Sequence, residues 1–261
     1  MARILITGGS GGLGHRLRGR LLPRGHTVRV ASRGPRPPGT PAEVEWTRTQ
    51  LATGDGLAAA VEGIETVIHA ASTPLSPRRV DVEGTRHLLR AALGGGVAHL
   101  LYISIVGIDD FPFAYYRAKR AAEGLIEGAS VPWTILRATQ FHELLDQRFL
   151  PALFALPLVA LVPTDFRFQT VDSGEVADRM VELVEAGPSG RADDVGGPEV
   201  LTMGEIASTW KQARGLSRAI VPLPVPGAAA AAFRRGQNTC PDRRYGTITW
   251  PDYLLGRYPP D

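Results

Sequence analysis

Residues Thr7 to Gly14 read Thr-Gly-Gly-Ser-Gly-Gly-Leu-Gly, and this stretch decides the fold that the sequence predicts. The apolar run Ala2 to Thr7 precedes it, and leucines recur with helical spacing over residues 13–22 after it. A short apolar run is typical of a buried strand, whereas the leucine spacing is typical of a helix. The stretch therefore predicts a strand, a glycine turn and a helix.

Three glycines of this turn stand at the spacing Gly-x-x-Gly-x-x-Gly. Gly8 allows the chain to turn, Gly11 lets the backbone approach a pyrophosphate, and Gly14 lets the helix pack on the strand. The first N–H groups of the helix offer partial positive charge to phosphates. We expect a dinucleotide to bind here, and a purely structural turn is the alternative.

Strand-like and helix-like segments continue to alternate after the turn. Strands are predicted at Thr27 to Ser32, Val44 to Trp46, Thr66 to Ala70, Val97 to Ser104 and Trp133 to Arg137, and helices at Leu57 to Glu62, Val80 to Leu93 and Tyr115 to Glu127. This alternation implies a parallel sheet with helices on both faces. The predicted fold class is α/β, a Rossmann-type doubly wound parallel sheet with a small C-terminal substrate lobe.

We expect a single domain over residues 1–261, with residues 1–140 as an NADP-binding Rossmann core. Residues 141–261 are expected to form mostly a substrate lobe over the carboxyl edge of the sheet, with some segments returning to the core. The apolar stretch Phe149 to Val162 is too short to span a bilayer and contains two prolines. We interpret it as the lining of an internal pocket, which favours a rather apolar substrate.

Composition narrows the classes of partner. The 29 Lys and Arg and 26 Asp and Glu residues give a net charge of +3, and the basic residues are spread along the chain rather than gathered for nucleic-acid binding. The single cysteine, Cys240, excludes an intramolecular disulfide and a CxxC zinc pattern, and no metal site is predicted. Met1 precedes the first strand without the regions of a secretory signal. We expect a cytoplasmic monomer or homodimer that acts on a small molecule, away from nucleic acids and membranes.

The end of the second strand indicates which dinucleotide binds. NAD sites usually carry Asp or Glu about 20 residues past the glycines, to bond the ribose 2′-hydroxyl. Here that place holds Ser32 and Arg33, and no Asp or Glu occurs before Glu43. An arginine attracts a 2′-phosphate, which no carboxylate would repel here. NADP(H) is therefore expected in preference to NAD(H), unless Arg33 merely extends into solvent.

Tyr115 and Lys119 stand four residues apart in a predicted helix, so both side chains leave the same face. A phenol has a pKa of about 10, and a neighbouring ammonium is expected to lower it. The pair suits a general acid that protonates a carbonyl oxygen while hydride arrives from NADPH. Ser104, at the end of the preceding strand, is expected to polarise the same oxygen. The alternatives for Tyr115 are Tyr116 as the acid or a core-packing role.

At these residues the chain resembles the short-chain dehydrogenase/reductases, and specifically their atypical, NmrA-like branch of NAD(P)H-binding oxidoreductases. The similarity is carried by the glycine loop and by Val67 to Ser72, Asp81 to Thr85, Tyr102 to Asp109, Tyr115 to Lys119, Leu136 to His142, Gln169 to Val171, Glu175 to Ala177 and Gly196 to Met203. It implies that Ala70 and Ala71 pack beside the adenosine, that Lys119 holds the nicotinamide ribose, and that Arg137 to Phe141 pass near the nicotinamide. The glycine loop, the second strand and this resemblance together predict cofactor contacts from Thr7, Gly8, Ser10, Gly11, Gly12, Leu13, Gly14, Ser32, Arg33, Gln50, Leu51, Ala70, Ala71, Ser72, Ile103, Lys119, Ala138, Thr139 and Phe141.

Three departures from the family pattern affect what can be transferred. Gln50-Leu51 stands where the family usually has Asp-Leu beneath the adenine, and Asp81 replaces the usual Asn. Ser104 lies only eleven residues before Tyr115. Several relatives in this branch bind cofactor without reducing anything.

Other polar residues are weaker candidates. His142 could face the substrate but is more typical of a structural histidine, and His69 is expected to be packed or hydrogen-bonded in the sheet. Asp109 and Asp110 are expected to cap the next segment rather than form a carboxylate pair. The leading hypothesis is an NADP(H)-dependent oxidoreductase that transfers a hydride between NADPH and a carbonyl or activated double bond of a small, rather apolar molecule. The alternative is a non-catalytic, NADP(H)-sensing regulatory protein of NmrA type, which would not need Tyr115.

Overall fold

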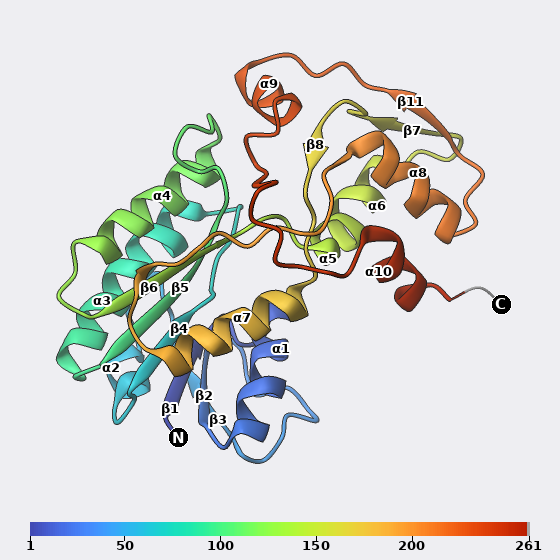
Figure 1. Cartoon of the computed structure of the whole chain (residues 1–261). Helices are drawn as coiled ribbons and strands as arrows, with labels where there is room; N and C mark the ends of the chain where they lie inside the picture. The colour runs from blue at the N-terminus through green and yellow to red at the C-terminus, as the bar shows by residue number, and fades with distance from the viewer. Residues whose placement is uncertain (260–261) are drawn as a thin grey trace. The chain divides into compact units, whose positions relative to one another are not determined.

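The computed structural model describes residues 1–259, and its largest feature is a seven-stranded sheet (Figure 1). The strands are β1 (Arg3–Thr7), β2 (Thr27–Ser32), β3 (Val44–Arg48), β4 (Thr66–His69), β5 (His99–Ile105), β6 (Trp133–Ala138) and β9 (Gly190–Arg191). They lie in the order β3-β2-β1-β4-β5-β6-β9, and the pairs β1–β2, β1–β4, β2–β3, β4–β5 and β6–β9 are parallel. The predicted Rossmann-type α/β fold is confirmed.

The strand order reverses at β1. The chain runs outward from β1 to β2 and β3, and then returns to place β4 on the other side of β1. At such a reversal the loops that follow the two neighbouring strands diverge, leaving a crevice at their carboxyl ends where ligands bind. The glycine turn directly follows β1, so the topology places it at this crevice.

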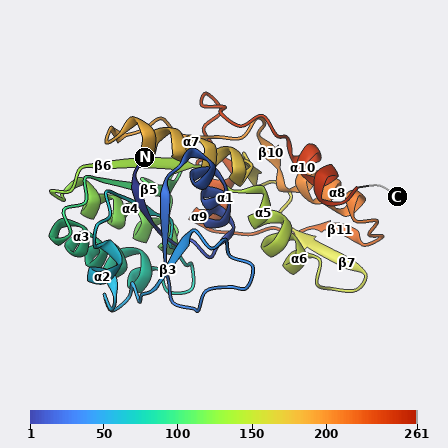
Figure 2. The ribbon, with the colours of Figure 1, turned by 90° about the horizontal axis from the view of Figure 1, so that it is seen from below.

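Helices cover both faces of the sheet (Figures 1 and 2). One face carries α2 (Leu57–Val61), α3 (Gly84–Gly94) and α4 (Ala114–Glu127), and the other carries α1 (Gly12–Leu21) and residues 177–186 of α7 (Ser173–Ala186). Arg20 of α1 donates two hydrogen bonds, of 2.6 and 3.0 Å, to the carboxylate of Asp178 in α7. Because both faces are covered, every residue of β4 is buried, as expected for a parallel sheet.

The chain divides into two compact units, each described by itself. The first consists of residues 1–104, 114–136 and 177–192, and contains the sheet and the helices named above. Its core is formed by aliphatic side chains such as Leu5, Val67, Leu88 and Leu100. The second consists of residues 105–113 and 137–176 and the described residues from Asp193 onward.

The second unit has its own core, which includes Phe154, Trp210 and Trp250. Its elements are α5 (His142–Leu144), α6 (Leu150–Leu153), β7 (Val159–Val162), β8 (Arg167–Phe168), β10 (Leu201–Thr202), α8 (Met203–Ala213), β11 (Ala219–Pro222), α9 (Ala228–Arg234) and α10 (Trp250–Arg257). β7 pairs with β11 in parallel, and β8 pairs with β10 antiparallel. Capping boxes begin α8 and α10, at Thr202 and Thr249.

The apolar stretch 149–162 differs from its interpretation as a pocket lining. Its buried side chains, which include Leu150, Phe154 and Val162, pack into the core of the second unit. Phe149 and Leu158 instead remain exposed. The stretch therefore supplies core side chains where an internal pocket wall was expected.

Two of the weaker candidates belong to the second unit. The His142 ring is buried, stacks on Tyr253, and uses Nε2 to donate a 3.1 Å hydrogen bond to the carbonyl of Ile248, so it has the structural role that was expected. The carboxylate of Asp109 accepts hydrogen bonds from two nitrogens of Arg137, one of them 2.9 Å long. Asp109 thus forms an ion pair with Arg137, and its expected capping role stays a prediction.

No helix within residues 1–259 combines the length and apolar character needed to cross a membrane. Within the same residues, no three His, Cys, Asp or Glu side chains are grouped as metal ligands would be.

Candidate functional site

Two glycines of the turn leave no room for a side chain, Gly8 against the neighbouring strand end and Gly14 against the turn itself. Gly8 has a φ of +73°, and a Cβ there would lie 2.7 Å from the backbone of Ala70. A Cβ on Gly14 would lie 2.4 Å from the Cα of Gly9. Atoms cannot approach so closely, so the packing of the protein itself requires glycine at positions 8 and 14.

Gly11 is different, because its own chain leaves room for a side chain. A Cβ there would meet only the carbonyl oxygen of Gly8, at 3.4 Å, and its φ of −83° suits any residue. Gly11 is also the N-terminal cap of α1, which has neither a side-chain cap nor an acidic residue in its first turn. The loop thus leaves backbone N–H groups and open space for an anionic group.

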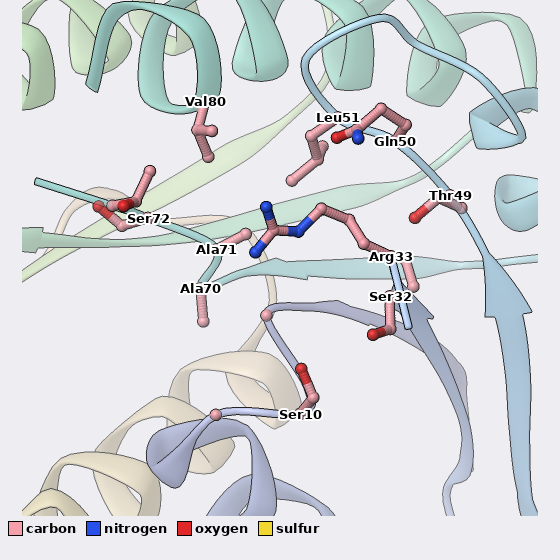
Figure 3. Close-up of a pocket in the computed structure, with 14 residues that line it drawn as sticks. Ser10, Ser32, Arg33, Thr49, Gln50, Leu51, Ala70, Ala71, Ser72 and Val80 are labelled. Atoms are coloured by element: carbon pink, nitrogen blue, oxygen red, sulfur yellow. The ribbon is translucent and has the colours of Figure 1, made fainter. Parts of the chain in front are cut away.

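The turn forms one wall of a pocket of about 250 Å³ at the carboxyl ends of β1, β2, β3 and β4 (Figure 3). The predicted cofactor residues that line it are Gly8, Ser10, Gly11, Ser32, Arg33, Gln50, Leu51, Ala70, Ala71 and Ser72. Sequence reasoning missed four lining residues: Ala31, Thr49, Thr73 and Val80. The first three each neighbour a predicted residue at a strand end, so the rule that ligands bind at these ends would have found them.

Two exposed arginines flank the pocket. Figure 3 shows Arg33 extending from the end of β2 across the pocket. Arg48 ends β3 in register with Ser32, and it lines a neighbouring hollow together with Arg33. Within residues 1–259, neither guanidinium forms an ion pair or hydrogen bond, whereas Arg29 pairs with Glu45.

His69 lies beneath the pocket and links three elements. Its Nδ1 is 2.7 Å from the hydroxyl of Thr7, and its Nε2 is 2.9 Å from the hydroxyl of Thr85. Burial, and secondarily the charge of Lys119, lower the pKa of His69 to about 3, so the ring is neutral. The expectation that His69 is hydrogen-bonded in the sheet is confirmed.

A polar cluster adjoins the pocket at Ser72. The Ser72 hydroxyl lies 2.7 Å from the hydroxyl of Tyr115 and donates a short hydrogen bond to Oδ1 of Asp81. The ammonium of Lys119 is buried, lies 4.0 Å from the same Oδ1, and donates a 2.8 Å hydrogen bond to the carbonyl of Ile103. Tyr115 and Lys119 both lie on α4, as predicted, and Ser72 and Asp81 connect them.

The expected effect of Lys119 on Tyr115 was wrong. Burial raises the pKa of Tyr115, with smaller contributions from Asp81 and Tyr116, and only the hydrogen bond with Ser72 opposes the shift. Lys119 lies against the ring of Tyr102, 4.1 Å from its centroid, where a cation is attracted to the π face. Burial lowers the pKa of Lys119 to about 8, although Asp81 and Glu123 favour its charged form. Tyr115 therefore keeps its proton at neutral pH.

Comparison with known proteins identifies the family. Residues 8–185 match the family described as NAD(P)H-binding. The chain belongs to the NAD(P)H-binding family. A relative, the (4-alkanoyl-5-oxo-2,5-dihydrofuran-3-yl)methyl phosphate reductase of Streptomyces griseus, is 29% identical over 240 residues, which cover 89% of this chain and 81% of that protein.

Two further matches are shorter or structural. The 3-beta-hydroxysteroid dehydrogenase of Mycolicibacterium neoaurum is 37% identical over 117 residues, which cover 39% of this chain and 31% of that protein. The NADPH-dependent quinone oxidoreductase from Escherichia coli, solved with NADPH, aligns with a TM-score of 0.79 over 98% of this chain and 99% of that one. Its sequence identity is 17%, so this match shows a shared fold.

The remaining predicted residues of this NAD(P)H-binding protein are spread over both units. Thr7 and Gly14 are buried beside the pocket, while Gly12 and Leu13 begin α1. Ala138, Thr139 and Phe141 belong to the second unit, where Ala138 bridges to Val195 and Phe141 bridges to Val171. Their contact with cofactor stays a prediction.

The side chains of Ser104 and Tyr116 are both buried but have different surroundings. The Ser104 hydroxyl is buried and has no hydrogen-bond partner among the described residues. Burying a hydroxyl without a partner costs folding free energy unless a water or a ligand completes its hydrogen bonds. Tyr116 is buried in the core next to Tyr115, whereas Tyr115 is half-buried and bonded to a pocket residue. Of the two, Tyr115 is therefore the one that contacts a residue lining the pocket.

Proposed function

We propose that this protein is an NADP(H)-dependent oxidoreductase of the short-chain dehydrogenase/reductase type, in its NmrA-like branch. It transfers a hydride between NADPH and a carbonyl or activated double bond of a small, rather apolar molecule. The observation that carries the proposal is the 2.7 Å contact between Tyr115 and Ser72, because Ser72 also lines the pocket next to the glycine turn. This contact supports Tyr115 as a proton donor at the edge of the cofactor pocket.

The chain's own groups suit reduction. Bound NADPH supplies the hydride. Tyr115 holds a proton at neutral pH and delivers it to the oxygen of the substrate, as a general acid must. The hydroxyl of Ser104, which has no hydrogen-bond partner among the described residues, polarises the same oxygen, and Lys119 would hold the ribose while it fixes the backbone at Ile103.

The cofactor preference follows from the two arginines. A 2′-phosphate bound at the end of β2 would meet the guanidinium of Arg33, which forms no ion pair with any residue of 1–259, and Arg48 lies one strand further out. Guanidinium groups bind phosphates through charge-assisted, bidentate hydrogen bonds. The two side chains therefore favour NADP(H) over NAD(H).

The substrate class rests on two features. A relative that covers 89% of the chain is named as a reductase, which supports a carbonyl or an activated double bond as the acceptor. Most of the stretch 149–162 packs into the core of the second unit, so only its exposed side chains Phe149, Leu156 and Leu158 support an apolar substrate.

The test is NADPH oxidation against a panel of quinones, ketones and enones. Tyr115→Phe keeps the ring but removes the proton, so turnover should fall by about a hundred- to ten-thousandfold, typical of a lost general acid. Its affinity for NADPH should barely change. Tyr116→Phe, which removes the neighbouring hydroxyl, serves as the matched control and should keep most of the activity.

Two results would count against this function. Activity that survives Tyr115→Phe at the wild-type level would remove Tyr115 from the chemistry. A complete absence of turnover across the panel, with NADPH binding intact, would favour an NADP(H)-sensing regulatory protein of NmrA type.

A further inference from the structure

A buried carboxylate stands behind the proposed proton donor. Asp81 is 1% exposed and lies in the π-helical turn Arg78–Glu83 that leads into α3. Its Oδ1 accepts the hydrogen bond of Ser72, and its Oδ2 accepts a 3.3 Å hydrogen bond from the backbone N–H of Thr73. A carboxylate is costly to bury, but it can accept a hydrogen bond at each oxygen, whereas an amide would turn a donor toward one of the two partners. Asp81 is therefore held with Oδ1 against the hydroxyl of Ser72.

The hydroxyl of Ser72 connects this acid to Tyr115. Ser72 has a single hydroxyl proton, and its oxygen lies between Oδ1 of Asp81 and the hydroxyl of Tyr115. When Asp81 is ionised it can only accept, so Ser72 donates to Asp81 and Tyr115 donates to Ser72. The phenol proton then points away from any substrate. When Asp81 is protonated, all donors can reverse, and the proton of Tyr115 becomes available to a substrate.

We propose that Asp81, Ser72 and Tyr115 form a proton relay in which Asp81 is the terminal acid of the reduction. The inference deepens the proposed function and rests on it. As a carbonyl carbon accepts hydride from NADPH, the carbonyl oxygen takes the proton of Tyr115. Tyr115 takes the proton of Ser72, and Ser72 takes that of Asp81. The products are the alcohol, NADP⁺ and the Asp81 carboxylate, which solvent reprotonates through the exposed hydroxyl of Ser72.

The surroundings of Asp81 suit an acid that gains and loses a proton. Burial raises the pKa of Asp81, while Lys119 and the hydrogen bonds from Ser72 and Thr73 lower it. The titratable groups that face it are Lys119 and Tyr115 on α4 and Tyr102 on β5; Thr85 of α3 bonds only its backbone carbonyl. The neighbouring ammonium stabilises the ionised product without being hydrogen-bonded to it, at 4.0 Å.

Asp81→Asn separates proton supply from positioning. The amide can donate to Ser72 and so hold Ser72 and Tyr115 in the donating arrangement, but it cannot give up a proton. If Asp81 only positioned Ser72, Asp81→Asn would behave as wild type and Ser72→Ala would be the damaging change. If Asp81 supplies the proton, both variants damage the reaction. Glu83→Gln, an exposed carboxylate in the same turn, is the matched control.

The first measurement needs no turnover. Infrared difference spectra of the protein, recorded over a pH series, should show a carboxylic acid C=O band that titrates, vanishes in Asp81→Asn and shifts in frequency in Ser72→Ala. The same band should persist in Glu83→Gln. Absence of any band assignable to Asp81, or a band that Ser72→Ala leaves unchanged, would overturn the relay.

The second measurement is the pH dependence of NADPH oxidation with menadione as the probe. In wild type the rate should fall as pH rises through the pKa of Asp81, because the acid form is the active one. Asp81→Asn and Ser72→Ala should react more slowly and lose this pH dependence. Their loss of rate should be smaller than that of Tyr115→Phe, which is about a hundred- to ten-thousandfold. Glu83→Gln should lose no activity. An unchanged pH profile in Asp81→Asn would overturn the relay while leaving the reductase in place. An Asp81 band that shifts in Ser72→Ala, together with no NADPH oxidation by the wild type, would support the hydrogen-bond connection of the relay and reject the proposed function.

Discussion

Removing one arginine at a time beside the cofactor pocket should weaken NADPH binding while sparing NADH. Arg33 and Arg48 both lie exposed at strand ends, and within residues 1–259 neither engages a carboxylate. Their charges are therefore available to a 2′-phosphate. Arg33→Ala and Arg48→Ala each remove one such charge without breaking an internal ion pair, so the fold should be unaffected.

The size of the effect follows from the exposure of the two side chains. A hydrogen bond between charged groups contributes about 1.5 to 3 kcal/mol, which corresponds to roughly ten- to a hundredfold in affinity. Solvent screening weakens exposed pairs. We therefore expect about tenfold weaker NADPH binding for Arg33→Ala and a smaller loss for Arg48→Ala. Arg33→Asp, which adds repulsion, should abolish or reverse the preference.

Calorimetry with NADPH and NADH measures both affinities for each variant. Arg36→Ala is the matched control, because Arg36 belongs to the same loop but bonds the carbonyls of Thr40 and Pro41. Arg36→Ala should change the NADPH affinity only slightly, because salt screens the long-range effect of the Arg36 charge. Equal affinity of the wild type for NADPH and NADH would refute the reasoning, as would equal losses for both cofactors in Arg33→Ala.

Three further predictions concern the loop and the buried histidine. Gly11→Val should abolish NADPH binding in a folded protein, because the added side chain meets only the Gly8 carbonyl and otherwise occupies ligand space; unchanged calorimetric affinity would make the loop a mere turn. Gly14→Ala should lower the free energy of unfolding in urea by at least about 1 to 3 kcal/mol through overpacking. Gly19→Ala in the same helix should not lower it, because no atom lies within 4 Å of a Cβ there. Equal stabilities of the two variants would contradict the packing argument. Because the pKa of His69 is about 3 when folded and 6.5 when unperturbed, the unfolded chain binds the proton first, so the free energy of unfolding should fall as pH drops from 6.5 towards 3. His69→Gln should lose part of this acid sensitivity when the free energy of unfolding is measured in urea over a pH series. An unchanged pH dependence in His69→Gln would count against the role of His69.

The parts of the fold that the sequence predicted are those that local pattern determines. Gly8 and Gly14 are required by contacts with the adjacent strand end and the adjacent turn, and such contacts recur wherever a strand, a glycine turn and a helix follow one another. The alternation of apolar runs and helical spacing likewise predicted the parallel sheet, since both patterns are read within one element.

The parts that the sequence could not predict depend on contacts between distant segments. Arg48 adjoins the cofactor site because β3 pairs with β2 in a register that puts it beside Ser32. The pKa of Tyr115 rises because burial outweighs any effect of Lys119, whose ammonium instead bonds Ile103. Sequence spacing put Tyr115 and Lys119 on one helix face, but it could not show that Ser72 and Asp81 lie between them.

The stretch 149–162 shows a different limit. Its composition alone suits a pocket wall or a core equally well, because both are apolar. Only the packing of Leu150, Phe154 and Val162 into the core of the second unit decides between the two.

The most direct test of the active site proposed here is a crystal structure of the protein with NADP⁺ bound. We predict the pyrophosphate on the N–H groups of the loop at Gly11, the 2′-phosphate on Arg33, and the Tyr115 hydroxyl within hydrogen-bonding distance of the space beside nicotinamide C4. A nicotinamide ring held away from Tyr115, or a 2′-phosphate that touches neither Arg33 nor Arg48, would contradict it.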